Sequence, residues 1–243
     1  MAEPRIGIAG WSIPGKDAAR FPADGTSLER YAGRLRCAEI NSCFHRSHRP
    51  ETYARWAASV SDDFRFAAKL AKTVTHQRKL VDCETLVDAF LAETSGLGAK
   101  LAVILVQLPP SLALDPSVAT PFFAALKQRT GAAIACEPRH PSWFEQEGDR
   151  LLDEAGVARV AADPARVEVA ARPGGWRGLT YYRLHGSPVM YRSSYDDGRL
   201  EAYAEALAAE RAAGQEVWCI FDNTASSAAT GDALRLQELL ATG

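Results

Sequence analysis

The segment CEPRHPSWF, residues 136–144, combines residue types that bind ions and transfer protons. An apolar run over 132–136 leads into Glu137, and Arg139 and His140 follow within three residues. Glu137 and Arg139 are two positions apart, so in an extended chain their side chains point the same way. Burial of an unpaired carboxylate is costly. The pair is therefore either a structural ion pair or part of a site that meets a ligand.

Other apolar runs along the chain also end in polar or aromatic residues. These runs cover 6–9, 37–40, 64–68, 101–107, 157–161, 180–184 and 216–221. At or just beyond their ends lie Trp11, Ser12, Glu39, Asn41, Lys69, His76, Gln107, Asp163, Arg183, His185, Asp222, Asn223 and Thr224, and Trp143 follows the 132–136 run. Ion pairs with a purely structural role need not gather at the same end of every strand. The gathering of these residues at the carboxyl ends of the runs therefore predicts a functional site.

The elements that must position these residues follow from the spacing of the runs. The runs are apolar throughout rather than alternating, which is typical of parallel strands covered on both faces. Most are followed by amphipathic stretches, and successive runs begin about 30 residues apart, the spacing of a β-strand and its following helix. Eight such units predict an α/β fold, a single TIM-type (β/α)8 barrel whose ligands meet the carboxyl ends of the strands.

One unit departs from this pattern. Between 163 and 180 the segment PARVEVAARPGGWRGL shows no clear helix, so we expect an irregular sixth unit. An open, doubly wound sheet is the alternative fold, although its usual phosphate-loop and dinucleotide fingerprints are absent from the sequence. Residues 1–243 contain no evident linker or repeat, which predicts one domain.

Composition limits the classes of function. The net charge is −2 over 243 residues, which argues against a general nucleic-acid or anionic-membrane binder but leaves room for a basic pocket. The five cysteines form no CxxC pair, and the first residues lack the features of a signal peptide. We therefore expect a cytoplasmic protein with free thiols, no membrane partner and an oligomeric state that the sequence leaves open.

The polar set favours an enzyme that acts on a small phosphorylated or carboxylated substrate by general acid–base chemistry. Glu39 or Glu137 is the expected base, and His185 or Lys69 the expected acid or electrophile. The expected substrate-binding residues are Trp11, Ser12, Asn41, His76, Gln107, Arg139, His140, Trp143, Arg183, Asn223 and Thr224. Gly-, Ser- and Thr-rich segments after the last two strands resemble the phosphate loops of such barrels. Glu39–Lys69 and Glu137–Arg139 are alternatively structural ion pairs. Hydrolase, lyase and isomerase chemistry all stay open.

Three other functions fit less of the sequence. No cofactor is expected, but Glu39, Glu137, Asp163, His185 and Asp222 would form a divalent-metal centre in a hydrolase-like or nuclease-like barrel. Nearby cations argue against it. A non-catalytic module would instead bind a nucleotide, nucleic-acid end or protein through exposed Trp11, Phe44 and Trp143. The third alternative makes Cys43, beside His45, a nucleophile.

Seven short segments, taken in order, resemble the YecE-like family, domain of unknown function family seventy-two. They are AGWS, EINSCFHR, FRFAAKLAKTVTH, VQLPPS, CEPRHPSWF, YYRLHG and FDNTASSAATGDAL, and together they extend over nearly the whole chain. The resemblance implies a TIM-type barrel and brings no established reaction. It also implies that the following positions recur in the family: Ser12, Glu39, Asn41, Lys69, His76, Glu137, Arg139, His140, Trp143, Arg183, His185, Asn223 and Thr224. The chain departs from the expected pattern at Cys43-Phe44-His45, where the family is expected to have a small hydroxyl residue followed by Phe-Tyr.

Overall fold

The computed structural model describes residues 3–242, and its strands form one ten-stranded sheet. The strands are β1 (Arg5–Ala9), β2 (Cys37–Ile40), β3 (Arg65–Lys69), β4 (Leu101–Gln107), β5 (Ala133–Glu137), β6 (Val157–Arg159), β7 (Ala161–Asp163), β8 (Gly174–Gly175), β9 (Leu179–Leu184) and β10 (Glu216–Phe221). Each of the eight predicted runs becomes a strand within about two residues of its expected bounds, which confirms the strand prediction.

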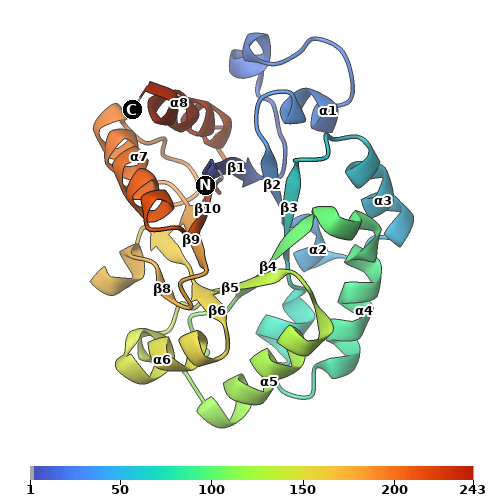
Figure 1. Cartoon of the computed structure of the whole chain (residues 1–243), viewed down its shortest axis with the longest axis vertical. Coiled ribbons are helices and arrows are strands. Elements are labelled where there is room, and N and C mark those ends of the chain that lie inside the picture. Colours follow the sequence, from blue (N-terminus) through green and yellow to red (C-terminus); the bar gives the residue numbers. More distant parts are fainter. Residues whose placement is uncertain (1–2, 243) are drawn as a thin grey trace.

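The sheet curls into a TIM-type barrel (Figure 1). Its order is β7-β9-β10-β1-β2-β3-β4-β5-β6-β8, and every pairing is parallel except that of β6 with β8. β6 and β7 follow each other in the chain with only Val160 between them. β6 pairs with β5 and β7 pairs with β9, so this interrupted strand brings the two ends of the sheet together.

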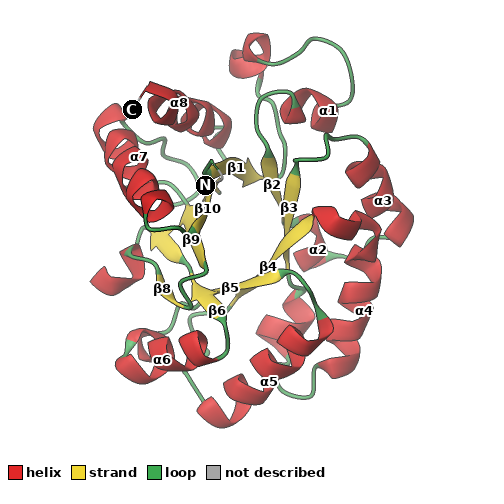
Figure 2. Ribbon diagram, in the orientation of Figure 1, coloured by secondary structure: helices red, strands yellow, loops and turns green. Residues whose placement is uncertain are grey.

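The helices surround the strands (Figure 2). They are α1 (Ser27–Ala32), α2 (Ser42–His45), α3 (Pro50–Ala58), α4 (Glu84–Thr94), α5 (Pro116–Arg129), α6 (Gln146–Glu154), α7 (Asp197–Ala212) and α8 (Ala229–Thr242). Short helical turns add η1 (Gly15–Arg20), η2 (Thr73–Gln77), η3 (Ser95–Lys100), η4 (Pro141–Phe144) and η5 (Glu168–Ala171). Among these elements, only η5 and β8 lie between β7 and β9, so the sixth unit is irregular as predicted.

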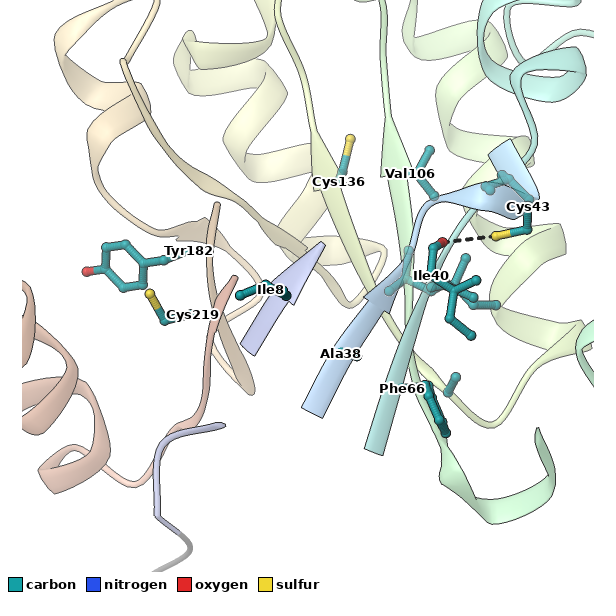
Figure 3. Packing of buried hydrophobic residues seen from close by; sticks show 14 of the residues in the cluster. Ile8, Ala38, Ile40, Cys43, Phe66, Val106, Cys136, Tyr182 and Cys219 are labelled. Atoms are coloured by element: carbon teal, nitrogen blue, oxygen red, sulfur yellow. Dashed lines mark hydrogen bonds between the residues drawn. The ribbon is translucent and has the colours of Figure 1, made fainter. Parts of the chain in front are cut away.

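The strands alternate side chains between two apolar cores. The outer core lies between strands and helices and includes Ile8, Ala38, Ile40 and Phe66, part of which Figure 3 shows. The inner core fills the barrel and consists of Cys37, Ala67, Val103, Leu105, Ala135, Ala158, Val160, Leu179, Tyr181, Trp218 and Ile220. Strands covered on both faces explain why the runs are apolar throughout.

The described residues also bear on two compositional expectations. The five cysteines are free and buried, which confirms the prediction of free thiols. Across residues 3–242, every helix is too short or too polar to cross a membrane.

Candidate functional site

The polar residues at the strand ends continue the inner core toward the carboxyl ends of the strands. Side chains alternate along a strand, so a residue two positions beyond an inner-core residue also points into the barrel. Ala67 therefore places Lys69 inside, and Tyr181 places Arg183 inside. The same alternation places Glu39, Gln107, Glu137, His185 and Asp222 inside the barrel. An apolar interior thus ends in a layer of ionisable groups.

Arg183 is at the centre of this layer. Its side chain is fully buried, and its Nε and Nη2 donate to the two carboxylate oxygens of Glu39 at 3.0 and 2.6 Å. Nη1 donates to Glu137 Oε2, and Nη2 also reaches Asp222 Oδ2 at 3.0 Å. Tyr181 donates its hydroxyl to Glu39 at 2.9 Å. One guanidinium therefore holds three carboxylates from β2, β5 and the end of β10.

His185 and Arg139 complete the network. The two ring nitrogens of His185 lie 3.1 Å from Asp222 Oδ2 and 3.1 Å from Glu137 Oε1. Arg139 donates to Glu137 Oε1 from Nε at 3.0 Å and from Nη2 at 2.8 Å. Glu137–Arg139 is therefore an ion pair in this fold. The alternative ion pair Glu39–Lys69 does not form, because Glu39 pairs with Arg183 instead.

The network controls the protonation of its members. Burial raises the pKa of Glu137, but the charges of Arg183, His185 and Arg139 outweigh it and hold that pKa well below its usual range. Asp222 behaves in the same way, because Arg183 and His185 outweigh its burial and lower its pKa. Burial lowers the pKa of His185, yet Glu137 and Asp222 raise it overall. Glu137 is thus a weaker base than an ordinary glutamate, and both ring nitrogens of His185 already have a carboxylate partner.

Lys69 differs from the other cations of the layer. Only 9% of Lys69 is exposed, and its Nζ lies 4.1 Å from the centre of the Phe44 ring. Within residues 3–242 its amine forms neither a hydrogen bond nor an ion pair. Burial lowers the pKa of Lys69, Arg183 adds to this effect, and the carboxylates of Glu39, Glu137 and Asp222 oppose it only in part.

His76 is a second basic group at this end of the barrel. It lies in η2, its Nδ1 is 2.9 Å from Thr75 Oγ1, and its ring contacts Phe44 edge-on at 5.0 Å. Burial lowers the pKa of His76, and the charges of Lys69 and Arg139 lower it further. His76 is therefore neutral near pH 7, and within the described residues its Nε2 has no hydrogen-bond partner.

A small pocket lies beside the network. Its volume is about 10 Å³, and it is lined by Glu137, Pro138, Arg139, Phe144, Ala162, Pro164, Arg166, Ala170, His185 and Met190. Arg166 is exposed and lies in the loop of the irregular sixth unit. Arg139 and Arg166 give this pocket two guanidinium groups, the side chains best suited to bidentate bonding of phosphate or carboxylate.

Five expected substrate-binding residues lie outside this cluster. Trp143 is 1% exposed, contacts Phe123 and donates Nε1–H to Leu112 O, so it belongs to the outer core and was wrongly expected to be exposed. His140 interacts with Ser142 and begins η4. Asn223 is buried and donates to Ser193 O and Asp232. Thr224 and Ser12 are exposed.

The expected phosphate site at the start of the last helix also changes. Asp232 lies in the first turn of α8, where its Oδ2 accepts from Asn223 at 2.7 Å and from the Tyr195 backbone at 3.2 Å. A carboxylate already lies close to the helix N-terminus, and it would repel a phosphate. The start of α8 is therefore unsuited to bind a phosphate.

Three further expected residues lie at the edge of the cluster. Trp11 is half-buried against Trp56 and Phe66, at ring distances of 5.0 and 6.5 Å. Asn41 follows β2, and its Oδ1 is buried without a hydrogen-bond partner in the described chain. Gln107 is the register partner of Glu137 and donates to Leu108 O at 3.3 Å.

Sequence reasoning missed Tyr181 and Arg166, and it considered Asp222 and Phe44 only in the alternative functions. Tyr181 looked like part of an apolar run, and Asp222 like a metal ligand. Alternation would have revealed Tyr181, because it lies two residues before Arg183 on one strand. Asp222 lies two positions after Ile220, whose side chain points into the barrel, so alternation would have placed Asp222 inside as well. The sequence held no signal for Arg166, which a loop brings to the pocket.

The geometry also bears on two alternative functions, the divalent-metal centre and the Cys43 nucleophile. The metal alternative used Glu39, Glu137, Asp163, His185 and Asp222. Arg183 binds Glu39, Glu137 and Asp222, His185 contacts two of these carboxylates, and Asp163 accepts from Arg199 at 2.8 Å. In residues 3–242 no group of three potential ligands has metal-binding geometry. Cys43 is buried and directs its thiol to Ile40 O and Lys69 O. Burial raises the pKa of Cys43 to about 12, which is wrong for a nucleophile.

Comparison with known protein sequences identifies the family of this chain. The family model described as "Protein of unknown function DUF72" matches residues 5–243. The chain belongs to the DUF72 family. It is also 35% identical to the UPF0759 protein YecE of Escherichia coli K12 over 175 residues. That alignment covers 69% of this chain and 61% of YecE, so the chain spans less than two thirds of that relative's length.

Solved structures of the DUF72 family share this fold. A DUF72 protein from Enterococcus faecalis V583 superposes with a TM-score of 0.82 at 20% identity, over 98% of this chain and 95% of that one. A DUF72 protein from Thermotoga maritima MSB8 gives 0.79 at 19% identity, over 99% and 100%. These likenesses confirm the TIM-type barrel, and the family's description assigns no reaction.

Proposed function

We propose that the protein is an enzyme that acts on a small phosphorylated or carboxylated substrate at the carboxyl-end mouth of the barrel. One observation carries this proposal: the carboxylates of the charged layer are paired, whereas Lys69 and His76 lack a carboxylate partner in the described chain. Arg139, Arg183 and His185 already pair with Glu39, Glu137 and Asp222. An anionic substrate group would therefore meet basic side chains and no unpaired carboxylate of this network.

The proposed roles follow from the protonation of each group. Lys69 and Arg139 bind the anionic group, and Arg166 supplies a further guanidinium from the adjacent pocket. His76 has a lowered pKa and an uncommitted Nε2, so it acts as the general base that accepts a proton and later returns it. Glu39, Glu137, Asp222 and Arg183 hold the shape of the site. This assignment moves the acid–base role from the glutamates to His76.

A thermal-shift titration tests the binding step. Inorganic phosphate, phosphorylated sugars and small dicarboxylates are added to the full chain and to the Lys69→Gln and Lys72→Gln variants. A ligand at a hundred times its Kd adds about 2.7 kcal/mol to stability, roughly a 5–10 °C rise in Tm for a domain of this size. We expect the rise with wild type and Lys72→Gln, and its loss in Lys69→Gln. Equal shifts in all three proteins contradict the proposal.

The catalytic step needs a second measurement. The ligand class that stabilises the protein is incubated with wild type and with His76→Asn, and products are followed by NMR. Removal of a general base lowers turnover by about 10²–10⁴-fold, and binding to Lys69 and Arg139 should persist. Binding without turnover in the wild type would instead identify a non-catalytic binding module.

A further inference from the structure

The amine of Lys69 is buried, whereas a lysine that only attracts anions usually keeps its amine in water. It points into the barrel from the last residue of β3, and it is 9% exposed. Its neighbour is the Phe44 ring at 4.1 Å, and within residues 3–242 its Nζ has neither a carboxylate partner nor a hydrogen-bond acceptor. Lysines that form covalent intermediates are buried in this way, because desolvation favours the neutral, nucleophilic amine.

The surroundings of Lys69 suit a covalent step. The charged groups that act on its amine are Arg183, Glu39, Glu137 and Asp222, with the imidazole of His76 also affected by it. Burial and Arg183 favour the neutral amine before reaction. The three carboxylates favour a positive charge afterwards. Their pairing with arginine keeps them in place, so the cavity need not reorganise when charge develops at this nitrogen.

Resting on the function proposed above, we propose that Lys69 is the nucleophile of the site and forms a Schiff base with a carbonyl substrate. The substrate class is then a 2-oxo acid or an aldehyde or ketone that carries a phosphate or carboxylate. In this step the anionic group binds Arg139 and Arg166 rather than Lys69, so the amine of Lys69 is free to meet the carbonyl carbon. The reaction class narrows to lyase or isomerase chemistry through an imine.

The step balances without any added reagent. The lone pair of Lys69 Nζ forms a C–N bond with the carbonyl carbon as the C=O π electrons move to oxygen. His76 relays a proton from the nitrogen to this oxygen, which gives a neutral carbinolamine. His76 then takes up a proton from solvent and gives it to the hydroxyl group, so that water leaves with the electrons of the C–O bond and a protonated C=N bond remains. Glu39, Glu137 and Asp222 stabilise its positive charge, and the iminium accepts electrons from the adjacent bond that breaks.

Borohydride trapping tests this proposal directly. The full chain is incubated separately with pyruvate, glyoxylate, dihydroxyacetone phosphate and glyceraldehyde 3-phosphate, each with sodium borohydride, and the adducts are mapped by peptide mass spectrometry. At least one compound should label Lys69 about tenfold faster than Lys72, because more of a buried amine with a lowered pKa is neutral. Labelling of Lys69 should also reach its half-maximal rate at a lower pH than labelling of Lys72.

Variants distinguish this step from anion binding. Lys69→Arg keeps the charge and should lose the adduct while the thermal shift with phosphate persists, and Lys72→Arg should keep both. If Lys69→Arg does not fold, the wild type decides: its thermal shift with phosphate reports the anion site, and its Lys69 adduct reports the Schiff base. Absence of a Lys69 adduct with all four compounds, or equal labelling of Lys69 and Lys72, overturns the Schiff base. The anion site then stands if the thermal shift persists, whereas loss of both results overturns both proposals.

Discussion

At the scale of single residues, the protein uses buried charge to hold other charges in place. Arg183 contacts Glu39, Glu137 and Asp222, and its own side chain is fully buried. Ion pairs of this kind are maintained because loss of one partner leaves a buried charge uncompensated, at a cost of about 3–5 kcal/mol. The same network leaves Lys69 and His76 as the groups free to meet a ligand.

His185 gives this network a measurable pH dependence. Its folded pKa is raised above the ordinary value of 6.5, so its contribution to stability is complete below pH 6.5 and is lost as pH rises through the folded pKa. We expect the difference in unfolding free energy between wild type and His185→Gln to shrink as pH rises from about 6 to about 9. His48 and His76 have lowered pKa values and contribute in the opposite direction in both proteins.

Urea denaturation at several pH values gives this difference. A difference that stays constant across the range would show that the two carboxylate neighbours do not raise the pKa of His185. Glu137 and Asp222 act at the acid end, because their lowered pKa values contribute stability above their unfolded values of 4.5 and 3.8. That contribution is lost as pH falls through their folded pKa values.

At the scale of elements, the sixth unit lacks a long helix, and a set of hydrogen bonds around Arg159 and Asp149, here called the clamp, holds its loop in place. Arg159 of β6 donates to Asp149 Oδ1 at 2.8 Å and to the carbonyls of Val169 and Arg172 at 3.2 and 3.3 Å. Asp149 also accepts from the Gly175 backbone at 2.9 Å. These contacts attach the segment that carries η5 and β8 to α6 and to the barrel.

We expect Arg159→Met to loosen this segment while the rest of the barrel stays protected. Methionine keeps an apolar stem but removes the donors, so amides over 168–176 should exchange faster with deuterium than in wild type. Amides of β1–β4 should be unchanged. Hydrogen-exchange mass spectrometry measures both regions, with Arg177→Met as the control for an exposed ion pair with Glu210. Unchanged exchange over 168–176 would contradict the clamp.

At the scale of the whole molecule, one stack of side chains connects the barrel floor to the charged layer. Trp218 is fully buried in the barrel and stacks on Tyr181 at 5.9 Å. Tyr181 in turn donates to Glu39, which binds Arg183. The apolar filling of the barrel therefore supports the site from below, and the outer helices hold the strands around it.

Trp218→Ala should destabilise the whole domain. Removal of a fully buried tryptophan costs about 3–5 kcal/mol, because it loses transfer energy and leaves a cavity. Urea denaturation measures this loss, and Val189→Ala, at an exposed position, is the near-neutral control. A loss below about 1 kcal/mol would mean that the barrel interior collapses readily around the missing ring.

The sequence by itself determined the barrel and the end at which the polar groups gather. Eight apolar runs and their spacing predicted the strands, because parallel strands buried on two faces must be apolar throughout. The same runs showed that Glu39, Lys69, Glu137 and Arg183 end at one side of the sheet. Each run and the polar residues at its end are neighbours in the chain, so residue types and their spacing are enough to predict them.

Only the tertiary structure decided which charges meet. Glu39 lies 144 positions from Arg183 and binds it rather than Lys69, because β2 and β9 bring these two side chains together across the barrel. Trp143 turned outward into the outer core, and Asn223 turned to Asp232. Partner choice depends on distance and direction in three dimensions, which residue types at strand ends do not specify.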